Sequence, residues 1–141
     1  MTKIAIIVAG FYEDIAKQMK ESVENILKKA DCEYEFLEVP GCFEIPSALH
    51  MAISSKKYDG YITLGCVIRG ETTHYDYVCE QSARGINDLA IKYHAAVGYG
   101  IITSENKQQA EKRASASGKD VGGRAAIACL EMLKIKQKMG I

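Results

Sequence analysis

The sequence predicts an α/β protein in which one parallel sheet is covered by helices on both faces. Apolar strand-like segments alternate with amphipathic helical segments along the whole chain. Such alternation is typical of a parallel sheet built with right-handed crossovers. With 141 residues, 48% hydrophobic and 26% charged, the chain has the size and composition of one globular domain spanning residues 1–141.

The first half of the chain predicts three strands separated by two helices. Residues 4–9 are continuously apolar, as in a strand covered on both faces, and residues 15–30 place apolar side chains at helical spacing. Residues 33–39 alternate like a second strand and stop at a Pro-Gly pair. A helix with Pro46 in its first turn follows. The third strand, residues 61–68, has the length and β-branched content of a buried one.

The second half predicts, in order, a helix over 78–93, a strand over 95–103, and helices over 105–116 and 122–137. Glycines 10, 41 and 70 and Thr103 all fall at or just after predicted strand ends. Ligand sites of open α/β sheets lie beyond the carboxyl ends of their strands. We therefore expect the functional chemistry along one edge of one sheet.

Charge and cysteine usage exclude several classes of protein. The 18 basic and 18 acidic residues give no net charge, which argues against a nucleic-acid-binding face and is compatible with a closed oligomer. Five cysteines without a CxxC pair indicate a reduced protein with no disulfide framework or zinc site. No apolar run approaches the roughly 20 residues of a membrane span, and the first strand is too short for a signal peptide. We expect a cytoplasmic protein that contacts neither membrane nor nucleic acid.

The segment Arg69-Gly-Glu-Thr-Thr-His74 follows the third strand directly. Its glycine, threonine hydroxyls, backbone amides and charged side chains are suited to hold an anion and move a proton near neutral pH. His74 is the leading candidate for a general acid or base, because histidine side chains ordinarily titrate near pH 6.5. His50 and His94 lie in and at the end of helices, where structural roles are predicted.

Other residues of this region keep two interpretations. Arg69 could form a structural ion pair, and Glu71 to Thr73 could cap a helix as well as bind an anion. Arg113, taken alone, is a solvated residue of a helix.

Two aromatic residues and a carboxylate suggest a site for a flat heterocycle held by stacking. Phe11 follows the first strand, Glu44 follows the second, and Tyr99 lies between Gly98 and Gly100, which we expect to leave space around its ring. Each aromatic could instead belong to the core.

The chain has no GxGxxG after its first strand and no GxxxxGK[ST], so a dinucleotide or nucleoside-triphosphate enzyme is disfavoured. Few acidic residues converge, and we predict no metal or other cofactor.

Five motifs resemble those of the lumazine synthase family, in matching order and spacing along nearly the whole chain. They are Ala9-Gly-Phe-Tyr12, Val39-Pro-Gly-Cys-Phe-Glu-Ile-Pro46, Gly65-Cys-Val-Ile-Arg-Gly-Glu-Thr-Thr-His-Tyr-Asp-Tyr-Val78, Gly100-Ile-Ile-Thr-Ser-Glu-Asn106 and Gln109-Ala-Glu-Lys-Arg-Ala114. The resemblance implies a flavodoxin-like three-layer sandwich with strand order 2-1-3-4. It also implies a transferase of riboflavin biosynthesis that condenses 5-amino-6-(D-ribitylamino)uracil with 3,4-dihydroxy-2-butanone 4-phosphate. The products are 6,7-dimethyl-8-ribityllumazine, phosphate and water.

The resemblance also assigns roles to residues of this chain. Phe11 would stack on the pyrimidine, and Cys42, Phe43 and Glu44 would hold the pyrimidine and the ribityl chain. Cys66, Val67 and Ile68 would line the pocket, Glu71 and Thr72 would take the butanone phosphate, and His74 would transfer protons. Tyr99 and Arg113 would come from a neighbouring subunit, with Arg113 on the phosphate. Two positions depart from the family pattern: Tyr12 stands where asparagine is usual, and Val121 stands where lysine is usual.

The same resemblance implies a homopentamer with active sites at the subunit interfaces. Family members that build 60-subunit shells commonly carry an extra N-terminal segment of about ten residues, which adds a strand to a neighbour's sheet. The first strand begins at about Lys3 here, so we expect a free pentamer or a decamer rather than a shell.

Two other functions stay open from the residues alone. One is a thiol-dependent hydrolase that pairs Cys66 or Cys42 with His74, although Val67 and Ile68 after Cys66 are more typical of a pocket wall than of an exposed nucleophile. The other is a non-catalytic flavin or lumazine carrier, which would have no use for an anion site.

Overall fold

The computed structural model describes all 141 residues. Its centre is a sheet of four parallel strands in the order β2-β1-β3-β4. The strands are β1 (Lys3–Ala9), β2 (Glu33–Val39), β3 (Gly60–Ile68) and β4 (Val97–Ser104). The predicted parallel sheet and its strand order are confirmed.

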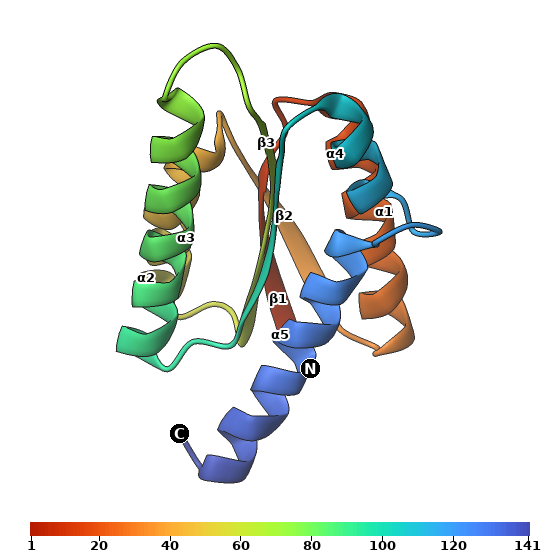
Figure 1. Ribbon diagram of the computed structural model, residues 1–141. Coiled ribbons are helices and arrows are strands. Elements are labelled where there is room, and N and C mark those ends of the chain that lie inside the picture. The colour runs from red at the N-terminus through yellow and green to blue at the C-terminus, as the bar shows by residue number, and fades with distance from the viewer.

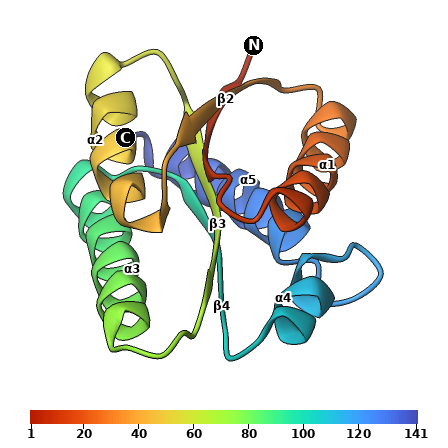
Figure 2. The same cartoon turned by 90° about the horizontal axis from the view of Figure 1, so that it is seen from above.

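Five α-helices cover the sheet in two layers (Figure 1). One layer contains α2 (Ile45–Ser55) and α3 (His74–Tyr93), and the other contains α1 (Glu13–Lys29), α4 (Lys107–Ala114) and α5 (Val121–Met139). The view from above shows α2 and α3 on one side of the strands and α1 and α4 on the other, while α5 overlaps the strands in the middle of this view (Figure 2). A short 3-10 helix, η1 (Cys42–Glu44), leads into α2. None of the helices combines the length and apolarity needed to cross a membrane.

The hydrophobic core lies on both faces of the sheet, as the apolar run of β1 predicts. Alternate side chains of β1 point to opposite faces: Ile4, Ile6 and Val8 belong to the cluster under α1 and α5, whereas Ala5 and Ile7 belong to the cluster under α2 and α3. Residues from 4 to 9 of β1 are all buried. Strand β2 is only partly buried, as its position at the sheet edge requires.

Several predicted boundaries need correction: helix α3 begins at His74 instead of residue 78, and capping explains the starts of α4 and α5. The helix predicted over 105–116 covers only Lys107–Ala114, since the Asn106 side chain accepts a hydrogen bond from the amide of Gln109 at 2.9 Å and so caps the helix. Helix α5 begins at Val121, where Asp120 accepts from the amide of Gly123 at 3.3 Å. Strand β4 begins at Val97, two residues later than predicted.

The interpretation of Gly98 and Gly100 was wrong. Both glycines face α5, not the ring of Tyr99. A Cβ atom at Gly98 would lie 2.7 Å from the carbonyl carbon of Ala125, and one at Gly100 would lie 3.0 Å from the Cβ of Ala125. The glycines therefore let α5 approach β4 closely, and Tyr99 between them points to the opposite face of the sheet.

Candidate active site

A cleft of about 360 Å³ opens at the carboxyl edge of the sheet. Its walls come from the ends of β1, β2 and β3 and from the first turn of α3, as expected for an open α/β sheet. Its size lies within the usual range for small-molecule sites. It is lined by Phe11, Tyr12, Gly41, Cys42, Phe43, Glu44, Cys66, Val67, Ile68, His74 and Val78.

The turn after β1 places two aromatic side chains at the cleft. Tyr12 is the N-cap residue of α1, with extended backbone angles, and its carbonyl accepts the amide of Ala16 at 2.9 Å. Phe11, one residue earlier, is 74% exposed. The two rings meet edge to face with their centroids 5.0 Å apart.

The turn after β2 packs closely against β3 because Gly65 of β3 has no side chain. Cys42 is buried, and its Sγ lies only 2.5 Å from where a Cβ of Gly65 would be. Because Gly65 has no Cβ, η1 can pack directly on β3. This brings the exposed ring of Phe43 and the carboxylate of Glu44 to the cleft beside Cys66 and Val67.

Arg69 fixes the loop between β3 and α3. Its Nε donates to Glu105 at 2.8 Å, its Nη2 donates to Asp76 at 3.2 Å, and its guanidinium lies 4.4 Å from the ring centroid of Tyr75. The backbone amide of Arg69 also donates to Ser104 at 2.9 Å. The structural ion pair, which the sequence left open, is therefore formed. It joins the first turn of α3 to the β4–α4 turn.

His74 is the first residue of α3 and reaches the cleft through an exposed side chain. The loop before it, residues 70–73, is exposed, and Thr72 Oγ1 accepts the amide of His74 at 3.3 Å. The N-cap residue Thr73 makes no side-chain capping bond. Glu71 and Thr72 lie next to the cleft along the chain but do not line it. The helix start thus keeps backbone N–H groups that could bind an anion.

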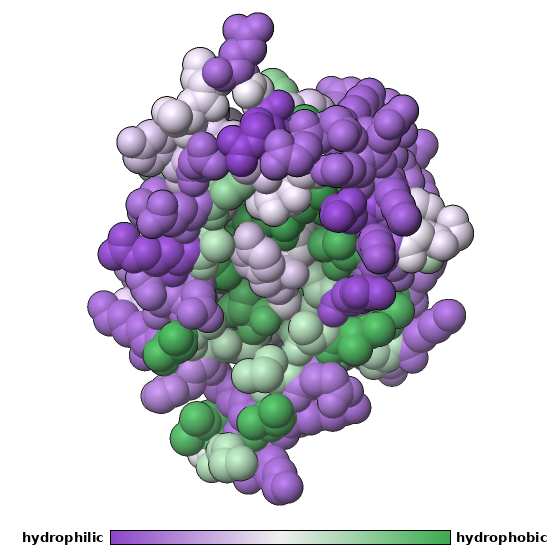
Figure 3. Space-filling model, viewed as in Figure 1, coloured by the Kyte–Doolittle hydropathy of each residue, from purple (hydrophilic) through white to green (hydrophobic).

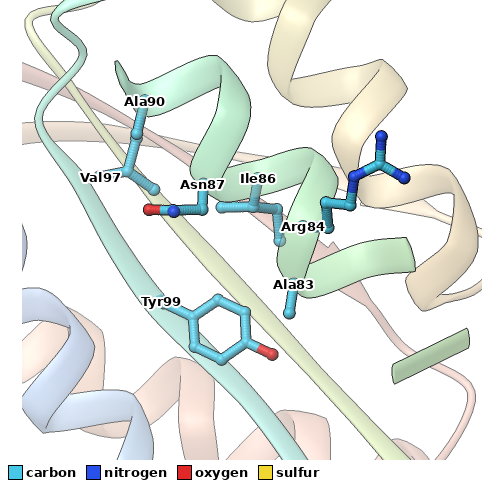
Figure 4. Close-up of a pocket in the computed structure, with 7 residues that line it drawn as sticks. All are labelled: Ala83, Arg84, Ile86, Asn87, Ala90, Val97 and Tyr99. Atoms are coloured by element: carbon cyan, nitrogen blue, oxygen red, sulfur yellow. The ribbon is translucent and has the colours of Figure 1, made fainter. Parts of the chain in front are cut away.

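Besides Glu71 and Thr72, two more predicted site residues, Tyr99 and Arg113, lie outside the cleft. Tyr99 lines a separate cavity of about 460 Å³ between β4 and α3, whose other walls are Ala83, Arg84, Ile86, Asn87, Ala90 and Val97 (Figure 4). Arg113 lies in the last turn of α4, on the other layer of helices, where its Nη1 donates to the carbonyl of Gln109 at 3.1 Å. Neither side chain lies with the cleft residues of this chain.

The thiols of the cleft are protonated at neutral pH. Burial raises the pKa of Cys42 to about 12 and that of Cys66 to about 11. A nucleophilic cysteine needs a lowered pKa and an exposed sulfur, and these side chains are buried. They serve as apolar wall atoms, as the apolar surroundings of Cys66 in the sequence predict.

The two histidines predicted to be structural have structural environments. His50 stacks on Tyr93, with ring centroids 5.5 Å apart and a hydrogen bond of 3.2 Å. His94 ends α3 in the left-handed conformation, at φ 52°. Neither histidine lines the cleft.

Three residues that line the cleft were not predicted to bind substrate: Tyr12, Gly41 and Val78. The helical spacing of Val78, one turn after His74, could have indicated it. Tyr12 was noted only as a departure from the family pattern. No group of three or more His, Cys, Asp or Glu side chains is arranged to hold a metal ion.

Comparisons with known proteins identify relatives over the whole chain. The family described as 6,7-dimethyl-8-ribityllumazine synthase matches residues 1–137. A protein of that name from Paramagnetospirillum magneticum is 40% identical, with 100% of this chain and 99% of the relative covered. The 6,7-dimethyl-8-ribityllumazine synthase 1 of Rhizobium meliloti is 44% identical over 97% of this chain and 93% of its own.

A solved structure shares the fold at lower similarity. It is a fragment of a protein described as a lipoprotein from Peptoclostridium difficile 630, with a TM-score of 0.55, 15% identity, and coverage of 96% of this chain and 99% of that one. Similarity at this level concerns the fold alone. The full-length relatives, the matching family and the cleft at the carboxyl edge agree, and the chain belongs to the 6,7-dimethyl-8-ribityllumazine synthase family.

Proposed function

We propose that this protein condenses 5-amino-6-(D-ribitylamino)uracil with 3,4-dihydroxy-2-butanone 4-phosphate to give 6,7-dimethyl-8-ribityllumazine, phosphate and water. This is the penultimate step of riboflavin biosynthesis. We also propose that residues 1–141 form a single domain and that the protein acts in the cytoplasm. Membership of the family over residues 1–137 supports the activity.

One observation in the structure carries the proposal: eight of the residues assigned to substrate by resemblance line a single cleft. They come from four separate segments between residues 11 and 74 and meet only in the fold. The cleft combines aromatic and aliphatic walls with one carboxylate and one imidazole. Such a mixture suits a flat heterocycle with a polar tail.

The pyrimidine would lie against the exposed ring of Phe11, and Glu44 and the 42–44 backbone would bind its polar edge and the ribityl chain. The butanone phosphate would lie on the loop at Glu71 and Thr72, where the start of α3 offers backbone N–H groups. His74, between the two substrates, would transfer protons during imine formation, phosphate loss and ring closure. Positioning of two reactants can supply about 7–11 kcal/mol of the barrier reduction, so this chemistry needs no protein nucleophile and no cofactor.

A second copy of the chain would complete the site. Tyr99 and Arg113 lie away from the cleft of their own subunit, and β4 is an edge strand with no partner on one side. Apolar side chains gather on this face, in the middle and down along α5 (Figure 3). The exposed large apolar residues of the chain include Ile91 of α3, Tyr99 of β4, and Met132, Ile135 and Met139 of α5.

Contiguous exposed apolar surface marks an interaction site, and a heterologous contact closes into a ring when the rotation allows it. We propose a homopentamer in which the β4 face of one subunit supplies Tyr99 and Arg113 to the cleft of the next. Light scattering at micromolar concentration tests the assembly. A mass near five or ten times 15.5 kDa is expected. A monomer mass would contradict the interface, and a megadalton particle would contradict the expected absence of a shell.

A two-product assay tests the activity. The purified full chain is mixed with both substrates, and lumazine formation and phosphate release are followed together. Equal amounts of the two products are expected. Binding of lumazine without phosphate release would favour the carrier function instead.

The thiol-dependent hydrolase is the other candidate, and the raised pKa values of Cys42 and Cys66 disfavour it. Iodoacetamide separates the two candidates. Quantitative alkylation that abolishes turnover, in the absence of unfolding, would support a thiol nucleophile, whereas a Cys66→Ala variant that still turns over would exclude that cysteine.

A further inference from the structure

Phe11 is an unusual platform for stacking because the protein covers little of it. Its side chain is 74% exposed, and it lies on a turn just beyond β1. An exposed side chain on a turn can rotate among staggered rotamers, and each rotation would remove the ring from the cleft. Some neighbour must therefore restrict the ring if it is to bind a flat ligand well.

Tyr12 is the aromatic neighbour that meets this ring. The centroids are 5.0 Å apart and the ring planes are inclined at 81°. This is the edge-to-face geometry that aromatic pairs favour, with the edge of one ring on the face of the other. No other aromatic pair includes Phe11.

Tyr12 is itself held firmly, on both its backbone and its side chain. Its carbonyl accepts the first intrahelical bond of α1 from Ala16 at 2.9 Å. Its half-buried ring packs on the core cluster under α1, and it also borders a small void beside Ile15 and Leu64. Burial raises the pKa of the Tyr12 phenol above its ordinary value of 10.0, so the phenol stays protonated even more firmly at physiological pH.

We propose that Tyr12 is a positioning residue, whose anchored ring orients the exposed ring of Phe11 over the cleft for stacking on the pyrimidine. The inference rests on the proposed function, because it takes Phe11 to be the stacking residue. Preorganisation reduces the ordering that binding must impose on a mobile side chain. Tyr12 therefore acts on pyrimidine affinity through Phe11, and the butanone phosphate, bound at the 71–72 loop, should be insensitive to it.

The test compares Tyr12→Leu with Tyr12→Phe in the full-length assembled protein. Leucine keeps apolar contact with the core but removes the aromatic ring, whereas phenylalanine keeps the ring. The dissociation constant of 6,7-dimethyl-8-ribityllumazine is measured by fluorescence titration, and KM is measured for each substrate separately. The interaction free energies typical of aromatic pairs predict that Tyr12→Leu weakens lumazine binding about 2- to 12-fold. The KM for the pyrimidine should rise by a similar factor, and the KM for the butanone phosphate should stay unchanged. Tyr12→Phe should restore both values to within about twofold of the parent.

Tyr34→Leu is the matched control. Tyr34 and Phe36 form a second edge-to-face pair, 5.8 Å apart at 78°, on β2. Tyr34 pairs with Ile4 near the start of β1, away from the carboxyl edge that holds the cleft. Tyr34→Leu removes this aromatic pair together with the hydrogen bond that the Tyr34 hydroxyl donates to Glu24 at 2.7 Å. It should therefore lower stability and leave both KM values unchanged.

Three results would overturn the inference: a Tyr12→Leu protein with parental affinity, a Tyr12→Phe protein as impaired as Tyr12→Leu, or equal increases of KM for both substrates. If Tyr12→Leu does not assemble, Tyr12→Met with the same readouts replaces it. Failure of the proposed function is distinguishable, since the parent protein would then form no lumazine at all. If the parent is active and Phe11→Leu loses affinity but Tyr12→Leu does not, only the positioning role fails.

Discussion

The close approach of α5 to β4 at Gly98 yields a quantitative prediction about stability. Replacing Gly98 by alanine would put a methyl group 2.7 Å from the carbonyl carbon and 3.3 Å from the Cα of Ala125, and closer still to its carbonyl oxygen. These are backbone atoms of a helix, which cannot rotate out of the way as a side chain could. The helix or the strand must therefore move, and packing around Ala125 and Ala126 must loosen with it.

The magnitude follows from two opposing effects. Overpacking of a filled core typically lowers the free energy of unfolding by about 1–3 kcal/mol. Because the added methyl group would meet rigid backbone atoms, we expect a loss at the upper end of this range. A Gly→Ala change also restricts the unfolded chain, which stabilises by about 0.4–1 kcal/mol. The free energy of unfolding should fall by about 2 kcal/mol. With a urea slope of about 2 kcal/mol per molar, the midpoint of denaturation moves down by about 1 M.

Urea denaturation followed by circular dichroism measures the change. All samples are kept at one protein concentration, because assembly into the proposed pentamer would make the midpoint depend on concentration. Gly70→Ala is the control. Nothing lies within 4 Å of its added methyl group and its φ is not positive, so its midpoint should stay equal or rise slightly. A Gly98→Ala protein with the midpoint of the parent would refute the close approach of α5 and β4.

Three further predictions concern the cleft. His74→Ala should slow turnover by about 10- to 10³-fold and leave the fold intact, which is at the low end of the rate loss expected when a general acid or base is removed. Unchanged single-turnover rates across pH 5–9 would remove His74 from the mechanism. Arg113→Ala should raise KM for the butanone phosphate far more than KM for the pyrimidine, because guanidinium–phosphate hydrogen bonds are charge-assisted. An unchanged KM for the butanone phosphate would indicate that Arg113 is a solvated helix residue. The buried Cys42 thiol should make the protein less stable in alkali, since its native pKa of about 12 lies above the ordinary 9.0. The unfolded state loses its proton first, so this thiol's contribution is intact below pH 9. It falls by about 1.4 kcal/mol per pH unit as the pH rises from 9 towards 12. Denaturation midpoints of the parent and of Cys42→Ala, measured between pH 8 and 11, check this fall. The stability of Cys42→Ala should decrease less steeply with pH than that of the parent, and identical slopes for the two proteins would contradict the prediction.

Periodicity and chain order were enough to predict the sheet and the edge that bears the site. The apolar run of β1 and the alternation of β2 are local properties, and each element follows from side chains within a few residues of one another. Chain order then places the ends of parallel strands at one edge. For this reason Phe11, Glu44 and His74 could be expected together before any contact was known. The strand order and the roles of individual residues came from family resemblance.

One error was avoidable from the sequence. Successive residues of a strand point to opposite faces, so Gly98 and Gly100 must face away from the ring of Tyr99 and cannot make room for it. The pattern itself indicated a close approach on the other face. Which helix makes that approach could not be known, because α5 begins more than 20 residues later and its placement depends on the packing of the whole layer.

The sequence by itself determined the elements, their alternation and the edge of the sheet where substrate chemistry belongs. Tertiary structure alone decided which candidates lie outside the cleft: Arg69 is occupied by Glu105, 36 residues away, and Tyr99 faces a different cavity from His74. The packing of Tyr12 against the core also set the edge-to-face contact between its ring and that of Phe11. The physical reason is that local patterns fix which side of an element is apolar, whereas the partner of a polar or aromatic side chain depends on where all other elements have packed.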